Sequence, residues 1–240
     1  MSRSALLAIS IFIFPFTLYA EEKPPWAHES EASIVKVDGN TTSDSYSAKQ
    51  KTSYRFDLNI ISASGRYLQT KASGSETAKQ WDATLRYERE LSDLWSLFIQ
   101  HGAESDPYAG YVQRDNSDIG GKYYLIKTDP ETLFSELGVR STKTISSVSN
   151  NVDYSTSCRL YIEYSKKINE SVSGKFWVEY LPNFKDSDAY LVNYEPSVSV
   201  MMNQVFSLKI AYLVKYHNLT LTAAEKKEDT TFTTALVAKF

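Results

Sequence analysis

The segment Phe232-Thr233-Thr234-Ala235-Leu236-Val237-Ala238-Lys239-Phe240 decides the fold. In an extended strand, Phe232, Leu236, Ala238 and Phe240 share one face because successive side chains point in opposite directions. A last strand with nothing beyond it leaves an open sheet edge, which invites pairing with other chains in a soluble protein. In a closed transmembrane barrel the last strand pairs with the first, so no edge remains. The segment therefore predicts the closing strand of a membrane β-barrel.

The N-terminus predicts a cleaved signal peptide over residues 1–20, with the barrel domain over residues 21–240. Arg3 supplies a positive charge, residues 5–14 are an apolar run, and Ala20 precedes two glutamates. The apolar run is too short to span a bilayer comfortably as a helix. We therefore expect export from the cytoplasm and removal of this segment.

Composition excludes several classes of protein. The net charge of -3 offers no basic surface for nucleic acid. The single cysteine, Cys158, excludes an internal disulfide framework and a cysteine metal site. Seventeen tyrosines, with many Ser and Thr residues, fit barrel strands that are apolar on one face only. They also fit a soluble periplasmic β-sandwich, which we keep as an alternative.

Alternating polar and apolar residues predict twelve strands, most of them about as long as a tilted transmembrane strand requires. They cover residues 32–37, 46–56, 59–70, 79–90, 94–103, 115–126, 132–143, 153–165, 171–181, 189–201, 205–216 and 229–240.

The connections between these strands alternate between tight and long. Outer-membrane barrels place short turns in the periplasm and longer loops outside. The tight ones lie near residues 57–58, 91–93, 128–130, 167–169 and 202–204, and the longer ones at 71–78, 105–114, 144–152, 182–188 and 217–228. A Greek-key sandwich has no reason to alternate in this way. We therefore predict an all-β, antiparallel up-and-down transmembrane barrel of about twelve strands in the cell outer membrane.

One face of the predicted strands carries charges of both signs. These side chains should point into a narrow lumen, where buried charges are normally paired. They predict either an ion-pair network that fills the lumen or a small polar conduit without ion selectivity. The candidate lumen residues are Arg86, Glu88, Arg140, Arg159, Glu163, Lys175 and Glu179.

An enzyme in the barrel wall is the main alternative, because outer-membrane lipid-modifying hydrolases use a serine and a histidine. His28 and Ser30 share one strand face, but no third residue is available to orient the histidine. Neither His101 nor His217 has a nearby serine in a persuasive arrangement, and no histidine pair has metal-ligand spacing. We therefore predict no catalytic residue, no metal and no cofactor.

Several segments of the chain together form a distinctive pattern: Trp81-Asp82-Ala83 with Arg86-Tyr87, Leu94-Trp95-Ser96-Leu97-Phe98, Asp106-Pro107-Tyr108-Ala109-Gly110-Tyr111 with Arg114, Gly120 to Asp129, and Trp26 with Gly39-Asn40-Thr41. This pattern resembles the YdiY-like family, described as salt-induced outer-membrane proteins of unknown function. Residues 120–123, Gly-Gly-Lys-Tyr, depart from the Gly-x-Gly-Tyr run that is usual there.

This resemblance spans the whole mature chain and implies no reaction. By resemblance to outer-membrane barrels, Phe240 is an assembly signal read by the barrel-assembly machinery. The expected surroundings are outer-membrane lipid and lipopolysaccharide. The function expected is a narrow channel or a structural envelope component linked to salt or osmotic conditions.

Overall fold

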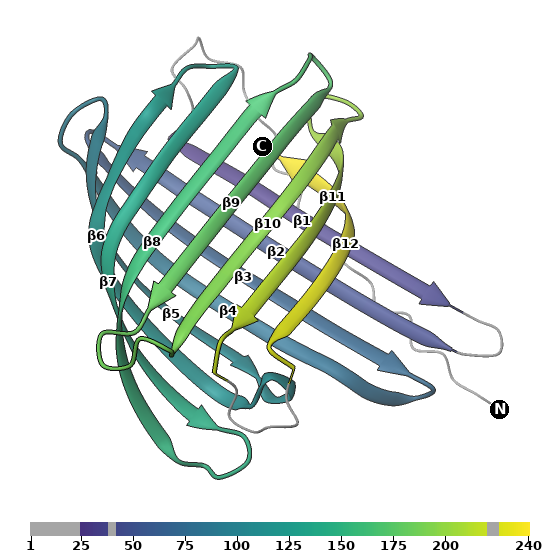
Figure 1. The fold of residues 1–240 in the computed structure, drawn as a ribbon. Coiled ribbons are helices and arrows are strands. Elements are labelled where there is room, and N and C mark those ends of the chain that lie inside the picture. Colours follow the sequence, from purple (N-terminus) through teal and green to yellow (C-terminus); the bar gives the residue numbers. More distant parts are fainter. Residues whose placement is uncertain (1–24, 38–41, 220–225) are drawn as a thin grey trace.

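A computed structural model of the protein describes residues 25–37, 42–219 and 226–240 (Figure 1). The predicted signal peptide lies outside these ranges. The described residues contain no helix long and apolar enough to cross a membrane. A single 3₁₀ turn, η1, covers Pro107–Ala109. The strands are β1 (Trp26–Val37), β2 (Ser43–Phe56), β3 (Asn59–Ala72), β4 (Ser75–Glu90), β5 (Trp95–Asp106), β6 (Tyr111–Lys127), β7 (Glu131–Ser146), β8 (Val152–Lys167), β9 (Val172–Pro182), β10 (Tyr190–Met201), β11 (Phe206–His217) and β12 (Glu228–Lys239).

Each strand pairs antiparallel with its sequence neighbours, and β1 pairs with β12 to close the barrel. The predicted twelve-stranded up-and-down barrel is therefore confirmed, and the soluble sandwich is wrong. Figure 1 shows the strands strongly tilted, as in barrels that span a membrane. We call the end that carries the turns β2–β3, β4–β5, β6–β7, β8–β9 and β10–β11 the inner end, and the opposite end the outer end.

Closure at the inner end involves Phe240 directly. The backbone N–H of His28 donates to the carbonyl of Phe240 at 2.7 Å, and the N–H of Phe240 donates back to His28 at 3.1 Å. The Phe240 ring lies 5.4 Å from the imidazole of His28. The ring centres of Trp26 and Tyr54 lie nearby, 4.5 Å apart, which adds to an aromatic girdle at this end.

Several strand boundaries differ from the sequence prediction, by up to six residues, and two regions show this clearly. The predicted long loop at residues 71–78 is instead a tight turn at Ser73 and Gly74, both with positive φ, as in a two-residue hairpin of the I′ type. Strand β1 begins at Trp26 rather than at residue 32. In both regions the ladder continues through polar residues, because backbone hydrogen bonds to the neighbouring strand do not require an apolar side chain.

Burial is inverted relative to a soluble protein. The side chains most hidden from solvent include Glu88, Asp118, Glu136 and Arg159, each at most 6% exposed. Large apolar side chains on the outer face of the wall are exposed instead, including Leu85, Leu97, Ile99, Ile119 and Leu137. An apolar exterior around a polar interior is the pattern of a barrel surrounded by lipid.

Two glycines leave the wall of the barrel without side chains next to Phe98. Gly120 and Gly138 are direct partners across β6 and β7, and Phe98 is the partner of Gly120 on β5. A Cβ atom at Gly120 would lie 2.5 Å from the carbonyl oxygen of Leu137 and 2.8 Å from Cζ of Phe98. The Phe98 ring therefore packs directly against backbone atoms at Gly120. Any residue larger than glycine at this position would displace the ring or the neighbouring backbone.

We predict that Gly120→Ala destabilises the barrel by about 1–3 kcal/mol, because the added methyl group overpacks this contact. Urea unfolding followed by heat-modifiable gel mobility measures the change. Gly174→Ala is the matched control, since its nearest neighbour would be the flexible tip of Ile168 at 3.6 Å. Equal stability of the two variants would contradict the packing assignment.

Candidate functional site in the lumen

Arg159 lies at the centre of the lumen and joins two carboxylates from different strands. Its Nη1 donates to Glu136 at 2.6 Å, and its Nε donates to Glu179 at 2.7 Å. Glu136 belongs to β7, Arg159 to β8 and Glu179 to β9, so these contacts connect three neighbouring strands. All three side chains point inward because each falls on the same face of its strand.

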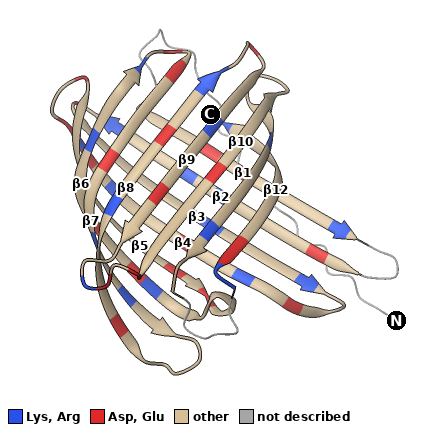
Figure 2. Ribbon diagram, in the orientation of Figure 1, with Lys and Arg blue, Asp and Glu red and all other residues tan. Residues whose placement is uncertain are grey.

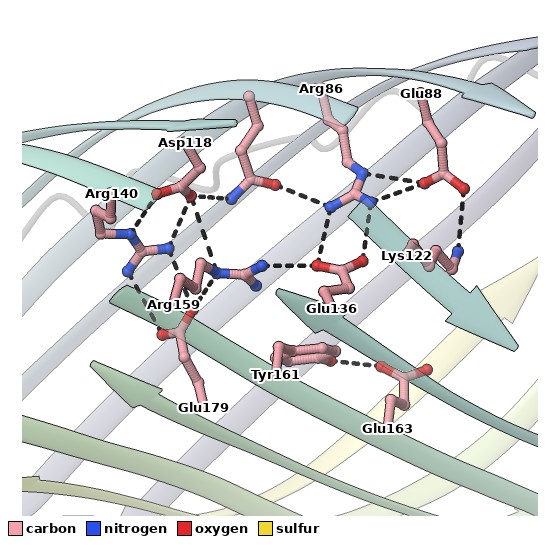
Figure 3. Close-up of polar contacts among 11 residues, drawn as sticks. Arg86, Glu88, Asp118, Lys122, Glu136, Arg140, Arg159, Tyr161, Glu163 and Glu179 are labelled. Atoms are coloured by element: carbon pink, nitrogen blue, oxygen red, sulfur yellow. Dashed lines mark hydrogen bonds and ion pairs between the residues drawn. The ribbon is translucent and has the colours of Figure 1, made fainter. Parts of the chain in front are cut away.

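The network extends from this centre in both directions (Figure 3). Arg140 makes a bidentate contact with Asp118, at 2.6 and 2.9 Å, and also donates to Glu179 at 3.1 Å. On the other side, Arg86 bridges Glu136 and Glu88, with 2.8 Å to each.

Lys122 ends the network with an ion pair of 3.2 Å to Glu88. Gln100 joins the two arms, because it donates to Asp118 and accepts from Arg86. Four cations thereby pair with four anions, and the cluster, which we call the lumen network, is electrically neutral. Its charged members are Arg86, Lys122, Arg140, Arg159, Glu88, Asp118, Glu136 and Glu179.

The lumen network is expensive to disrupt. Asp118 is 2% exposed, and Arg159 and Glu136 are each 5% exposed. Removing one partner of such a buried pair typically costs about 3–5 kcal/mol, because the remaining charge stays buried without compensation. The two glycines of the wall contribute here as well. They let Phe98 sit beneath the guanidinium groups of Arg86 and Arg159, at 4.0 and 5.7 Å from the ring centre.

Several further ion-pair groups lie outside this cluster. Lys175 pairs with Glu163 at 2.8 Å, and the hydroxyl of Tyr161 donates to the same carboxylate at 2.6 Å. Lys209 pairs with Glu31 at 3.2 Å and with Glu195 at 3.4 Å. Charges of both signs are therefore distributed over the whole circumference of the barrel (Figure 2).

The structure places all seven charged residues that the sequence nominated on the inner face. It brings Arg86, Glu88, Arg140, Arg159 and Glu179 into the lumen network and keeps Glu163 and Lys175 as a separate pair. The sequence argument missed Asp118 and Gln100. The alternation of β6 does carry a signal for Asp118, because it has the same parity as Lys122 and lies opposite the apolar face at 119, 121, 123 and 125.

A cavity of about 1330 Å³ opens above the lumen network at the outer end. Its floor contains Asp118, Arg140 and Glu179. Its walls mix charged side chains such as Asp82, Glu104, Arg114 and Lys215 with hydroxyl and amide side chains, among them Asn116, Thr142, Thr144, Ser155, Ser157 and Asn193.

The β5–β6 connection folds over this mouth. Asp106 accepts a hydrogen bond from the N–H of Ala109 at 3.0 Å and fixes the turn η1. The hydroxyl of Tyr108 then donates to the carbonyl of Glu76 on β4 at 2.9 Å. Tyr108 and Tyr111 both line the cavity, so this connection narrows its entrance.

Below the cavity the lumen is packed. The inward-facing residues Ala211, Ala235 and Val237 are at most 4% exposed, and Ser96 on the opposite wall is 2% exposed. An open outer cavity therefore meets a closed middle section that the lumen network crosses.

The serine and histidine residues form no catalytic set among the described residues. His28 contacts Thr52 at 3.0 Å while Ser30 donates to Gln50 at 2.5 Å, so these two residues have separate partners. His101 was expected to have no nearby serine in a persuasive arrangement, yet its Nδ1 lies 2.9 Å from Oγ of Ser117 on the adjacent strand. Their direct cross-strand pairing, invisible in the sequence, brings them together. In the described part of the chain no carboxylate contacts this imidazole.

Known structures share the fold at very low sequence identity. The barrel is similar to a NanC porin, with a TM-score of 0.52, 8% identity, and coverage of 89% of this chain and 97% of the other. It is also similar to the COG4313 outer membrane channel from Pseudomonas putida F1, with a TM-score of 0.51, 11% identity, and coverage of 90% and 94%. At such identity the likeness shows the fold alone.

Sequence comparison gives the family. Among curated proteins, no sequence matches this chain. The family model described as "Protein of unknown function, DUF481" matches residues 30–240, which is nearly the whole barrel and confirms the YdiY-like resemblance. The chain belongs to the DUF481 family.

Proposed function

We propose that this protein is a non-enzymatic outer-membrane channel whose narrow lumen is restricted at mid-height by the lumen network. The observation that carries the proposal is the outer cavity of about 1330 Å³, whose floor consists of the network residues Asp118, Arg140 and Glu179. Small hydrated ions can enter such a cavity, and their further passage depends on rearrangement of ion pairs. The fold of known porins and channels supports this assignment.

The exterior supports an outer-membrane location. Apolar side chains project outward around the wall, and an aromatic cluster of Trp26, Tyr54 and Phe240 lies at the inner end. Lys71 and Lys79 lie near the outer ends of β3 and β4, where they suit contact with the phosphates of lipopolysaccharide.

The lumen network also supports a link to salt. Mobile ions screen charge pairs, and the screening length falls from about 10 Å at 0.1 M salt to about 3 Å at 1 M. Partly solvated pairs at the floor of the outer cavity, such as Arg140 with Glu179, are the first that ions reach. Salt therefore favours opening of the middle section.

Planar-bilayer recording of the refolded protein tests the channel. We expect small conductance steps at about 0.1 M KCl, and at about 1 M KCl an increase larger than that of the bulk conductivity, because screening loosens the network. Absence of conductance above background at both concentrations would contradict the channel and leave a structural envelope protein.

Charge changes at the cavity floor should set ion preference. Glu179→Gln preserves size but leaves Arg140 and Arg159 in excess, so the lumen becomes positive and the permeability ratio shifts several-fold toward anions. Arg140→Met should shift it toward cations. The zero-current potential in a KCl gradient measures both effects. Lys167→Met, at an exposed inner turn, is the control and should leave this potential unchanged. Identical potentials in all variants would contradict conduction past this floor.

Phe240 should be required for assembly, because it closes the barrel with two backbone hydrogen bonds and a ring contact to His28. Phe240→Asp is expected to reduce the folded, heat-modifiable protein in outer membranes several-fold. Val148→Asp, in the exposed β7–β8 loop, is the control and should assemble normally. Normal membrane levels of Phe240→Asp would argue against a role for Phe240 in recognition by the assembly machinery.

A further inference from the structure

The seam between β1 and β12 is closed over only part of its length. Strand β1 pairs with β2 from Trp26 to Val37, and β12 pairs with β11 from Glu228 to Ala238. The two seam strands pair with each other only from Glu29 to Ala32, opposite Lys239 to Leu236. Beyond Ala32, no register pair joins them among the described residues. Figure 1 shows the outer parts of β1 and β12 diverging.

This divergence lies at the depth of the outer leaflet. A strand rises about 3.3 Å per residue and is tilted by about 45° in a membrane barrel. From Trp26 in the inner aromatic cluster, Ile34 is therefore roughly 19 Å along the membrane normal, within an apolar band about 25 Å tall. The seam consequently opens toward lipid rather than toward water.

A cavity of about 400 Å³ lies at this position. Its lining includes Thr231 and Thr233, which face the lumen, together with Thr230 and Phe232, which face outward on the same strand. Residues from both faces of β12 can line one cavity only where the edge of that strand is free. The exposed fractions of the side chains agree with a free edge, since Phe232 is 68% exposed, whereas Leu236 on the paired part of β12 is 45% exposed.

Each strand at the opening carries one large apolar side chain on its outward face. Ile34 on β1 is 69% exposed and Phe232 on β12 is 68% exposed, and the register of the closed part offsets the two by two residues. Val35 and Leu68 continue the apolar surface into the cavity. A hydrocarbon chain in the outer leaflet therefore meets compatible side chains at the entrance.

The interior of the cavity is rich in hydroxyl groups and has no positively charged side chain among its described lining residues. It is lined by Ser33, Ser45, Ser47, Thr70, Thr231 and Thr233. The acids among the described lining residues are Asp106, which is engaged by Ala109, and Asp229. Such a surface suits an uncharged head group that carries several hydroxyls.

The unpaired backbone groups at the strand edge also favour an uncharged, hydroxylated head group. Unpaired backbone N–H and C=O groups at hydrocarbon depth cost several kcal/mol each. Alternate backbone groups of residues 33–37 face the seam rather than β2. A hydroxylated head group can hydrogen-bond to them, which a plain hydrocarbon cannot do.

We propose that the β1–β12 seam is a lateral portal through which a neutral single-chain amphiphile enters the barrel from the outer leaflet and binds in the adjoining cavity. This route is separate from the axial passage of ions past the lumen network. It requires no covalent step. The chain would remain between Ile34 and Phe232 while the head group occupies the hydroxyl-lined interior.

Cysteine cross-linking tests the opening in a Cys158→Ser background. Directly opposed residues in a closed ladder have Cβ atoms about 4.5–5.5 Å apart, within reach of a disulfide after small adjustment. Ser30→Cys with Ala238→Cys, a register pair of the closed part, should cross-link readily in isolated outer membranes. Ile34→Cys with Thr234→Cys continues the same register on the outward face and should cross-link several-fold less. Equal yields would overturn the portal.

Photolabelling of the full-length protein in lipid vesicles tests the ligand. The probe is an octyl glucoside with a diazirine on its glucose head group, and its control is the sulfate ester of the same probe. We expect adducts of the neutral probe on Ser45–Ser47 and Leu68, several-fold above those of the sulfate. Ser47→Phe, which fills the cavity, should abolish them, whereas Ala48→Phe, on the outward face of the same strand, should not.

Labels confined to outward residues such as Ile34 and Phe232, or equal labelling by both probes, would overturn the proposal. Covalent dimers formed by Ile34→Cys alone would also overturn it, because a second copy would then cover the seam. Each of these results leaves the bilayer conductance unaffected, so failure of the portal is distinguishable from failure of the channel.

Discussion

Satisfaction of backbone hydrogen bonds at hydrocarbon depth is the constraint on which the rest of this structure depends. Twelve strands meet it by pairing with both neighbours, and the ring closes where Glu29–Ala32 meet Leu236–Lys239. The hydrogen bonds between His28 and Phe240 seal its inner end. Only four register pairs make the closure, so this seam is the shortest ladder between neighbouring strands among the described residues.

Closure has a second consequence inside the barrel. Charged residues that alternate with lipid-facing ones are forced together in a narrow space, where each must find a partner. Arg159 has ion-pair partners because Glu136 and Glu179 project from the two adjacent strands. Gly120 and Gly138 also leave room for Phe98 beneath its guanidinium group. The result is a neutral cluster that braces β4 to β9, while β10 and β11 contribute the separate ion pair of Glu195 with Lys209.

Much of the fold follows from local patterns. A period of two identifies strands such as β4 and β11, and it assigns Arg86, Arg159 and Glu179 to one face without any knowledge of their partners. The pattern fails at the start of β1 and around the β3–β4 turn, where polar residues continue a ladder held by the backbone. It also leaves out Asp118, near the polar beginning of β6, although the parity of that strand would have included it.

The sequence by itself determined the number of strands, their alternation and the inward face of the charges, because a period of two is a property of each strand alone. Only the tertiary structure decided which charges pair, that His101 lies against Ser117, and that the seam is incomplete. Those features depend on the register and tilt of all the strands of the barrel together. A pairing such as Arg86 with Glu136 joins residues 50 positions apart, and nothing local to either residue encodes it.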